Sequence, residues 1–127
     1  MPNTLFTAQS MRRTETPNAV MTTIASPSQG PTDGVTLWKV AMRADQQGPL
    51  HVFDREQIWH VLTGEVEIAL GGERLHLVAG DAAVLPAGAE RQVTAVTATE
   101  MVVCGPAEAV VTVPGEDDSR GTPPWIS

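Results

Sequence analysis

Two short stretches of the chain hold the residues best suited to chemistry: residues 48–65, GPLHVFDREQIWHVLTGE, and residues 86–93, PAGAERQV. His51 can take or give a proton near neutral pH. Arg91 carries a permanent charge on a planar guanidinium, which can bind a carboxylate or a carbonyl oxygen through two hydrogen bonds. Gln57 adds a neutral amide. If the fold brings them together, these residues predict proton transfer or anion binding.

Short apolar stretches between glycines and prolines indicate the elements that carry these residues. The chain has 127 residues, with 11 Gly and 10 Pro, which suits one domain of many brief strands. We predict antiparallel strands at residues 18–26, 35–42, 51–53, 57–63, 65–70, 73–78, 82–85, 91–96 and 100–104. The sequence therefore predicts an all-β domain at residues 17–113, after an arm at 1–16 and before a polar, Pro-rich tail at 114–127.

The two-residue period of a strand assigns side chains to faces. It places His51 and Phe53 on one face of their strand, and Gln57, Trp59 and Val61 on one face of the next. His60 then points the other way.

One further strand and one hairpin give the same kind of prediction. Lys39 marks the wet face of residues 35–42, so Trp38 and Met42 should point inward. The Gly71-Gly72 pair predicts a hairpin turn, which leaves His76 on the solvent face of the following strand.

Residues 48–93 resemble the cupin superfamily, whose two motifs are written G-x5-H-x-H-x3,4-E-x6-G and G-x5-P-x-G-x2-H-x3-N. The matching residues are His51, Gly64, Gly80, Pro86 and Gly88. The departures are Asp45 for the first glycine, Phe53 for the second histidine, Gln57 for the glutamate, Arg91 for the third histidine and Ala95 for the asparagine. The resemblance implies a single jelly-roll β-barrel of short antiparallel strands, usually dimeric, with the motif positions pointing inward.

The resemblance also raises the question of a metal. In metal-binding cupins three histidines and a carboxylate, or sometimes a glutamine, hold a divalent ion. Here Phe53 offers no lone pair and Arg91 places a cation at a ligand position. Two unit charges about 4 Å apart repel by about 4 kcal/mol at an effective dielectric near 20, and a divalent ion doubles this. We predict no metal and no cofactor; if a metal binds, its ligands would be His51 and Gln57.

The barrel interior should be an apolar pocket with few polar groups, the usual form of a small-molecule site. We predict His51, Arg91 and Gln57 as its catalytic residues. The predicted substrate-binding residues are Trp59, Phe53, Trp38, Met42 and Val61. For Trp38 and Met42, core packing outweighs ligand contact.

The polar residues also have structural alternatives. Because an unpaired buried charge is costly, Arg91 needs a partner, which could be Asp54, Glu56 or a backbone carbonyl instead of a substrate. His51 could be a buried neutral imidazole satisfied by Gln57.

Small cupins occur among cyclases of polyketide and related natural-product pathways, so the resemblance permits a metal-independent cyclase or isomerase acting on a small organic molecule. Two alternatives stay open. One is a non-catalytic ligand-binding or sensor cupin, and the other is a divalent-metal-dependent oxygenase or isomerase.

The composition and charge of the chain limit the classes of partner that we expect. A formal charge of −7 disfavours nucleic acid and anionic membrane surfaces. No stretch approaches the roughly 20 apolar residues of a membrane span, and the N-terminus lacks the apolar core of a secretion signal, so we expect a cytoplasmic protein. The single Cys104 is expected to be a small buried hydrophobe.

Two terminal features bear on assembly. The polar arm, together with the dimeric state that the cupin resemblance implies, suggests a homodimer. Trp125 and Ile126, near the end of the tail, could dock on their own domain or on a partner.

Overall fold

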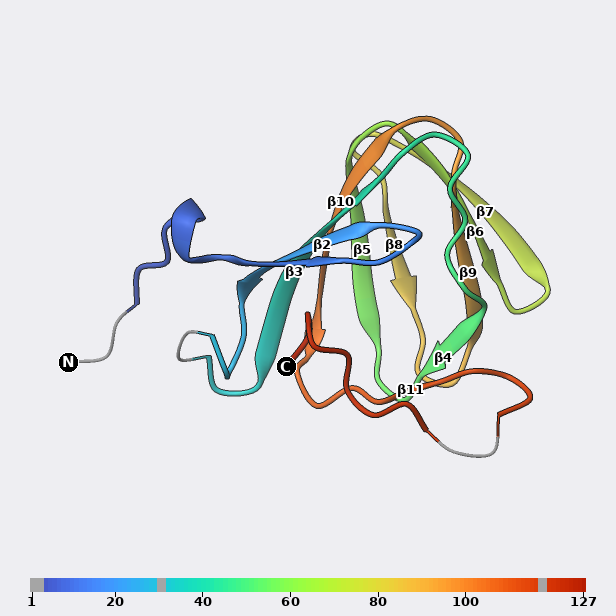
Figure 1. The fold of residues 1–127 in the computed structure, drawn as a ribbon. Helices are drawn as coiled ribbons and strands as arrows, with labels where there is room; N and C mark the ends of the chain where they lie inside the picture. Colours follow the sequence, from blue (N-terminus) through green and yellow to red (C-terminus); the bar gives the residue numbers. More distant parts are fainter. Residues whose placement is uncertain (1–3, 30–31, 117–118) are drawn as a thin grey trace.

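Short antiparallel strands in two facing sheets form nearly all of the regular structure (Figure 1). The computed structural model describes residues 4–29, 32–116 and 119–127. The first sheet contains, in spatial order, β1 (Arg12–Glu15), β2 (Val20–Ala25), β3 (Val35–Met42), β10 (Thr99–Pro106), β5 (Gln57–Thr63) and β8 (Ala82–Leu85). The second contains β11 (Val111–Thr112), β4 (His51–Phe53), β9 (Glu90–Ala95), β6 (Glu65–Leu70) and β7 (Glu73–Val78). The predicted all-β jelly-roll barrel is confirmed.

Helix contributes little to this fold. The short 3-10 helix η1 (Ala8–Ser10) precedes β1. In the part of the chain that the structure describes, no helix is long and apolar enough to cross a membrane.

The predicted strands agree closely with the observed ones between residues 35 and 104. Six of them, β3 to β8, have the predicted bounds. The sequence pattern did not predict β1 or β11. The β1 sequence RRTE lacks apolar alternation, and it becomes a strand because its backbone pairs with β2, with Arg12 opposite Thr23. The two-residue β11 likewise depends on its pairing with β4.

The core fills the space between the two sheets, and strand alternation selects the residues that enter it. Val66 and Ile68 of β6 are fully buried, and Leu77 of β7 is buried opposite Val66. On the outer face of the same hairpin, His76 is exposed and forms a hydrogen bond with Glu65. The predicted faces of this hairpin are therefore confirmed.

Two motif positions lie in turns with a left-handed backbone. Gly64, between β5 and β6, has a φ of +86°, and a Cβ on it would lie 2.2 Å from the carbonyl oxygen of Ala98. Asp45, which stands at the position of the motif's first glycine, keeps a left-handed φ of +69°. Aspartate tolerates this conformation better than most residues. The substitution thus preserves the turn that leads towards β4.

The tail docks on its own domain, which is one of the two predicted possibilities. Ile126 is fully buried and Trp125 packs against the core. The hydroxyl of Thr23 on β2 donates to the carbonyl oxygen of Trp125 at 2.7 Å, and the Ser28 amide donates to the carbonyl oxygen of Ser127 at 3.2 Å. The C-terminal segment is thereby fixed against the open end of the barrel. Exchange of the N-terminal arm in a dimer stays a prediction.

We predict that Gly64→Ala is much more destabilising than Gly71→Ala. Both glycines have a positive φ, but a Cβ on Gly71 would meet nothing within 4 Å. Gly71→Ala should lower the free energy of unfolding by roughly 1–2 kcal/mol, the cost of the left-handed conformation. Gly64→Ala should lose about 2 kcal/mol more through backbone collision. Urea denaturation of the two variants measures the difference, and equal losses would contradict the close approach.

Candidate functional site

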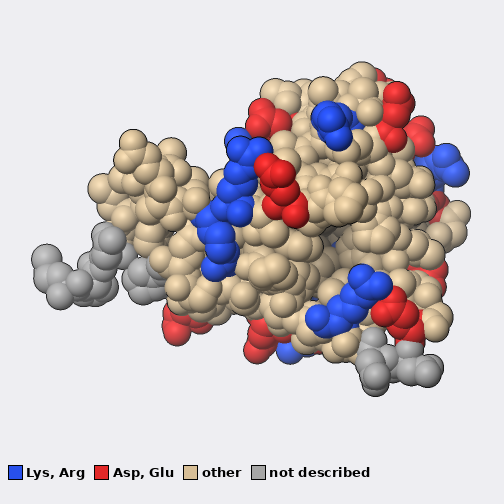
Figure 2. Space-filling view, viewed as in Figure 1, with Lys and Arg blue, Asp and Glu red and all other residues tan. Residues whose placement is uncertain are grey.

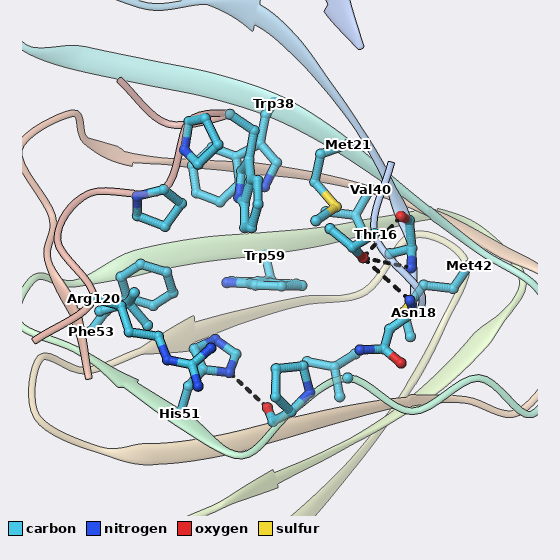
Figure 3. Close-up of a pocket in the computed structure, with 18 of the residues that line it drawn as sticks. Thr16, Asn18, Met21, Trp38, Val40, Met42, His51, Phe53, Trp59 and Arg120 are labelled. Carbon is cyan, nitrogen blue, oxygen red and sulfur yellow. Dashed lines mark hydrogen bonds between the residues drawn. The ribbon is translucent and has the colours of Figure 1, made fainter. Parts of the chain in front are cut away.

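A cavity of about 410 Å³ lies at the open end of the barrel, between the sheets and the C-terminal segment. Its wall is mostly apolar, and all three tryptophans of the chain, Trp38, Trp59 and Trp125, belong to it. Figure 3 shows Trp59 in the middle of the cavity, with Trp38 across from it. Aromatic surfaces of this kind offer a planar ligand large contact areas.

Five of the eight predicted site residues line this cavity. They are His51, Phe53, Trp59, Trp38 and Met42. All of these except His51 are also buried members of the hydrophobic core, so for Trp38 and Met42 core packing and cavity lining coincide.

The other three predicted site residues do not line the cavity. Val61 is fully buried in the core, and Gln57 and Arg91 are buried beside Phe53 and Trp59 without being part of the wall. The expectation of three polar groups facing a ligand must therefore be corrected. Only His51 of that set faces the cavity, because its aromatic neighbours cover the other two.

A hydrogen bond to the backbone holds the His51 ring in one orientation. Its Nδ1 forms a 2.7 Å hydrogen bond with the carbonyl oxygen of Pro49. A carbonyl can only accept, so Nδ1 carries the hydrogen and Nε2 of the neutral ring keeps its lone pair. The ring also packs edge-on against Phe53, with 5.2 Å between centroids. His51 therefore presents a basic nitrogen on a fixed ring.

The pKa of His51 is lowered from its ordinary value of 6.5. Burial is the largest cause, since it disfavours the charged ring. The hydrogen bond to Pro49 acts in the opposite direction, and the positive charge of Arg91 lowers the pKa further. At neutral pH the imidazole is thus a neutral base. The alternative in which Gln57 satisfies it does not hold, because the partner is Pro49.

Arg91 is fully buried, and its guanidinium is occupied by the protein itself. Nη2 donates to the carbonyl oxygen of Pro86 at 2.9 Å, Nε to that of Ala89 at 3.3 Å, and Nη1 to Oε1 of Gln57 at 3.2 Å. Backbone carbonyls were one of the predicted alternatives. Asp54, another of them, instead accepts a hydrogen bond from the Val110 amide at 2.7 Å.

The charge of Arg91 is not neutralised by an ion pair within residues 4–29, 32–116 and 119–127. Its guanidinium carbon lies 5.5 Å from the centre of the Phe53 ring, in a cation–π contact. Burial lowers the pKa of Arg91 to about 10, so the side chain is still a cation at neutral pH. The cavity floor therefore has a buried positive charge directly behind it.

Gln57 joins this cation to the aromatic floor. Its Oε1 accepts hydrogen bonds from Nη1 of Arg91 and, at 3.1 Å, from Nε1 of Trp59. An amide oxygen has two lone pairs, and both are in use. Gln57 is therefore a positioning residue that sets the orientation of the Trp59 indole.

These residues do not fit a divalent metal ion. Of the motif positions, His51 alone has a free donor atom, since Gln57 has committed its oxygen, Phe53 has no lone pair and Arg91 is a cation. In the described part of the chain, no three His, Cys, Asp or Glu side chains form a group suited to a metal. Instead of holding a metal, the residues at three of the ligand positions, Phe53, Gln57 and Arg91, contact one another.

The predicted set missed residues from both ends of the chain. Thr16 and Asn18 line the cavity on one side, and Arg120, Pro123 and Pro124 line it near the tail. For the tail, one sequence signal was present, the apolar pair at residues 125–126 after a polar run. No sequence signal indicated Arg120, because the cavity wall there depends on how the tail docks.

Two other residues weighed from the sequence lie outside the site. His60 of β5 is opposite Val102 of β10, on the face away from Trp59, as predicted. Cys104 of β10 is a free thiol and half-buried, so it is less enclosed than expected.

Comparison with known proteins agrees with this geometry at the level of the fold. The cupin domain model matches residues 38–113, and no curated protein matches the sequence. A solved RmlC-like cupin from Shewanella frigidimarina NCIMB 400 has a TM-score of 0.71 and 14% identity, over 82% of this chain and 90% of that one.

Two similar structures are enzymes of greater length. Oxalate decarboxylase of Bacillus subtilis, with Mn(II) centres, has a TM-score of 0.75 and 12% identity, over 84% of this chain and 30% of that one. Salicylate 1,2-dioxygenase of Pseudoaminobacter salicylatoxidans, in adducts with gentisate, has a TM-score of 0.72 and 17% identity, over 83% and 31%. At these identities the likeness shows the fold alone. With more than half of its length matched by the cupin domain, the chain belongs to the cupin family.

Proposed function

We propose that the protein is a metal-independent enzyme that isomerises or cyclises a small, largely apolar organic molecule in the barrel cavity. The observation that carries this proposal is His51, a neutral base in the wall of an apolar cavity whose Nε2 has no hydrogen bond to a described residue. A side chain that is held in place and unprotonated at the working pH can act as a general base.

The shape of the cavity supports a substrate of a few fused or linked rings. Its 410 Å³ lies within the range of about 300–1,000 Å³ of typical ligand pockets. Trp38 and Trp59 offer flat surfaces to such a molecule, and holding it in a reactive geometry can itself contribute greatly to the rate.

The chemistry we propose begins at a carbon next to a carbonyl group. Nε2 of His51 takes the proton from that carbon, and the electron pair moves to the carbonyl oxygen to give an enolate. The buried charge of Arg91 favours this negative charge through its field, without contact. When the substrate has a carbon–carbon double bond next to that carbon, the enolate is conjugated with it. Return of the proton from His51 to the far end of this double bond then moves the double bond and completes an isomerisation.

Ring closure uses the same enolate. Its carbon attacks a second carbonyl carbon of the folded substrate, a carbon–carbon bond forms, and the alkoxide takes the proton back from His51. Polyketide-like molecules carry several carbonyl groups with acidic carbons between them, so they suit this sequence of steps.

A non-catalytic ligand carrier or sensor is the competing proposal. It is favoured by the internal hydrogen bonds of all three Arg91 nitrogens and of the Gln57 amide oxygen, which leave His51 as the titratable group of that cluster that faces the cavity. The exchange experiment below separates the two functions.

We predict that His51 titrates below 6.5 in the folded protein and that Arg91→Met raises its pKa. The substitution removes a positive charge that lowers the His51 pKa, while Arg91→Lys keeps the charge and should raise the pKa less. NMR titration of the ring signals, assigned with His51→Gln, measures all three. An unchanged pKa in Arg91→Met would show that the field of Arg91 does not reach His51.

The same shift links stability to pH. Because the folded pKa of His51 is lowered, the unfolded chain binds more protons between the two pKa values. The contribution of His51 to stability is therefore lost as the pH falls from above 6.5 towards the folded pKa. If the base is catalytic, the acid limb of kcat/KM should also lie below pH 6.5.

We predict that the protein catalyses hydrogen–deuterium exchange at the carbons beside the carbonyl of 2-tetralone, a bicyclic ketone. His51→Ala should slow the enzymatic exchange by about 10²–10⁴-fold, the usual contribution of a positioned base. His76→Ala, which changes an exposed histidine on β7, is the matched control and should keep the rate. Proton NMR follows the exchange. Binding of 2-tetralone without exchange would support the carrier instead.

We also predict that the protein purified without added metal salts holds far less than one divalent ion per chain. EDTA should leave the exchange rate unchanged, because the motif positions do not supply enough ligands. Elemental analysis gives the metal content. Stoichiometric metal, together with loss of exchange in EDTA, would favour the metal-dependent alternative.

A further inference from the structure

We propose that the cavity selects organic acids and that Arg120, from the C-terminal segment, binds their acidic group. This proposal rests on the proposed small-molecule function of the cavity and adds the substrate class. It makes Arg120 a specificity-determining residue outside the cupin motifs.

The backbone of Arg120 is fixed next to the barrel. Its amide donates to the carbonyl oxygen of Val111 at 2.9 Å, and the Val111 amide donates to the carbonyl oxygen of Gly121 at 3.0 Å. These two bonds pair the C-terminal segment with β11, which in turn pairs with β4, the strand of His51. The buried Ile126 anchors the segment further along. The backbone of Arg120 therefore has a defined position, on the same side of the cavity as His51.

The guanidinium of Arg120 is available to a ligand. Nε and Nη2 form hydrogen bonds with Glu116, at 3.2 Å and 2.6 Å, and Nη1 has no hydrogen bond to a described residue. The side chains of this pair are 59% and 40% exposed. Water screens such a pair, as it does the adjacent basic and acidic side chains visible on the surface in Figure 2. An acid that enters the cavity can bind Arg120 together with Glu116, or it can displace Glu116 from Arg120.

The charges around the cavity favour an anion at this end. No aspartate or glutamate is among the described residues that line the cavity. Arg91 lies behind Phe53 without an ion pair in the described chain. A low-dielectric wall screens this charge less than water would. Within the described residues, the charged side chain in the cavity wall is thus Arg120, whose acidic partner Glu116 lies outside the wall, although the whole chain carries a formal charge of −7.

The two ends of the cavity differ in polarity. Figure 3 shows Arg120 and His51 at one end, Thr16 and Asn18 at the other, and Trp59 between them. The second end holds neutral polar groups, and the hydroxyl of Thr16 is already bonded to the Ala19 carbonyl oxygen. The matching ligand is an elongated aromatic or polycyclic acid, with its acidic group at Arg120 and its apolar body over Trp59.

The test compares naphthalene-2-carboxylate with its neutral counterpart naphthalene-2-carboxamide on the full chain. Isothermal titration calorimetry gives both Kd values, and the emission of the three tryptophans reports entry into the cavity. The carboxylate should bind about tenfold more tightly, as expected for a charge-assisted hydrogen bond. Arg120→Gln should abolish this preference, and Arg120→Lys should keep part of it.

Two further variants make the test specific. Glu116→Gln frees the guanidinium and should tighten carboxylate binding while leaving the carboxamide unchanged, so it opposes Arg120→Gln in sign. Arg74→Gln removes an arginine that is exposed on β7 and paired with Glu67, and it should change neither affinity.

Each result decides between the proposals. Equal affinity for the two probes, or a carboxylate preference that survives Arg120→Gln in a folded variant, overturns acid selection but leaves small-molecule binding intact. Failure of both probes to bind, with unchanged tryptophan emission, overturns acid selection and the proposed use of the cavity together.

Discussion

The site depends on one buried interaction, the hydrogen-bonded Arg91 guanidinium. The carbonyl oxygens of Pro86 and Ala89 that receive it belong to the turn of the second cupin motif, and the third acceptor is Gln57 of the first motif. One cation thus joins the two motifs, as a metal ion would do through its ligands. A buried charge needs such partners, and here dipoles of the amide and carbonyl groups supply them.

The remaining features of the cavity floor follow from this cation. Gln57 orients Trp59 because its oxygen accepts from both Arg91 and the indole. Phe53 covers the guanidinium with its ring and separates it from the cavity. His51 is kept neutral by burial and by the nearby positive charge. The replacements at the motif positions are therefore mutually compatible, because the aromatic ring of Phe53 and the Arg91 cation attract each other.

The termini complete the cavity that the barrel alone would leave open. Near the N-terminus, Thr16 and Asn18 between β1 and β2 line it, and the tail contributes Arg120 and Trp125. Both segments are held mainly by backbone pairing, through β1 with β2 and through the bonds of Val111 with residues 120 and 121. The cupin domain match ends at residue 113, so this wall of the cavity lies outside the matched domain.

The sequence by itself determined the fold, the bounds of six strands and the inward face of most of them, because apolar alternation and left-handed turns are local properties. It also placed His51 and Phe53 at the site through their motif positions, and Trp59 through strand alternation. Only the tertiary structure decided that Arg91 and Gln57 are covered, since this depends on which ring packs over them. It likewise decided the strand at residues 12–15, which depends on backbone pairing with β2. The cavity role of Arg120 depends on docking of the tail, where Thr23 meets Trp125 from far along the chain. Strand alternation says which face a side chain occupies, but packing between distant segments sets whether that side chain meets solvent, ligand or another residue.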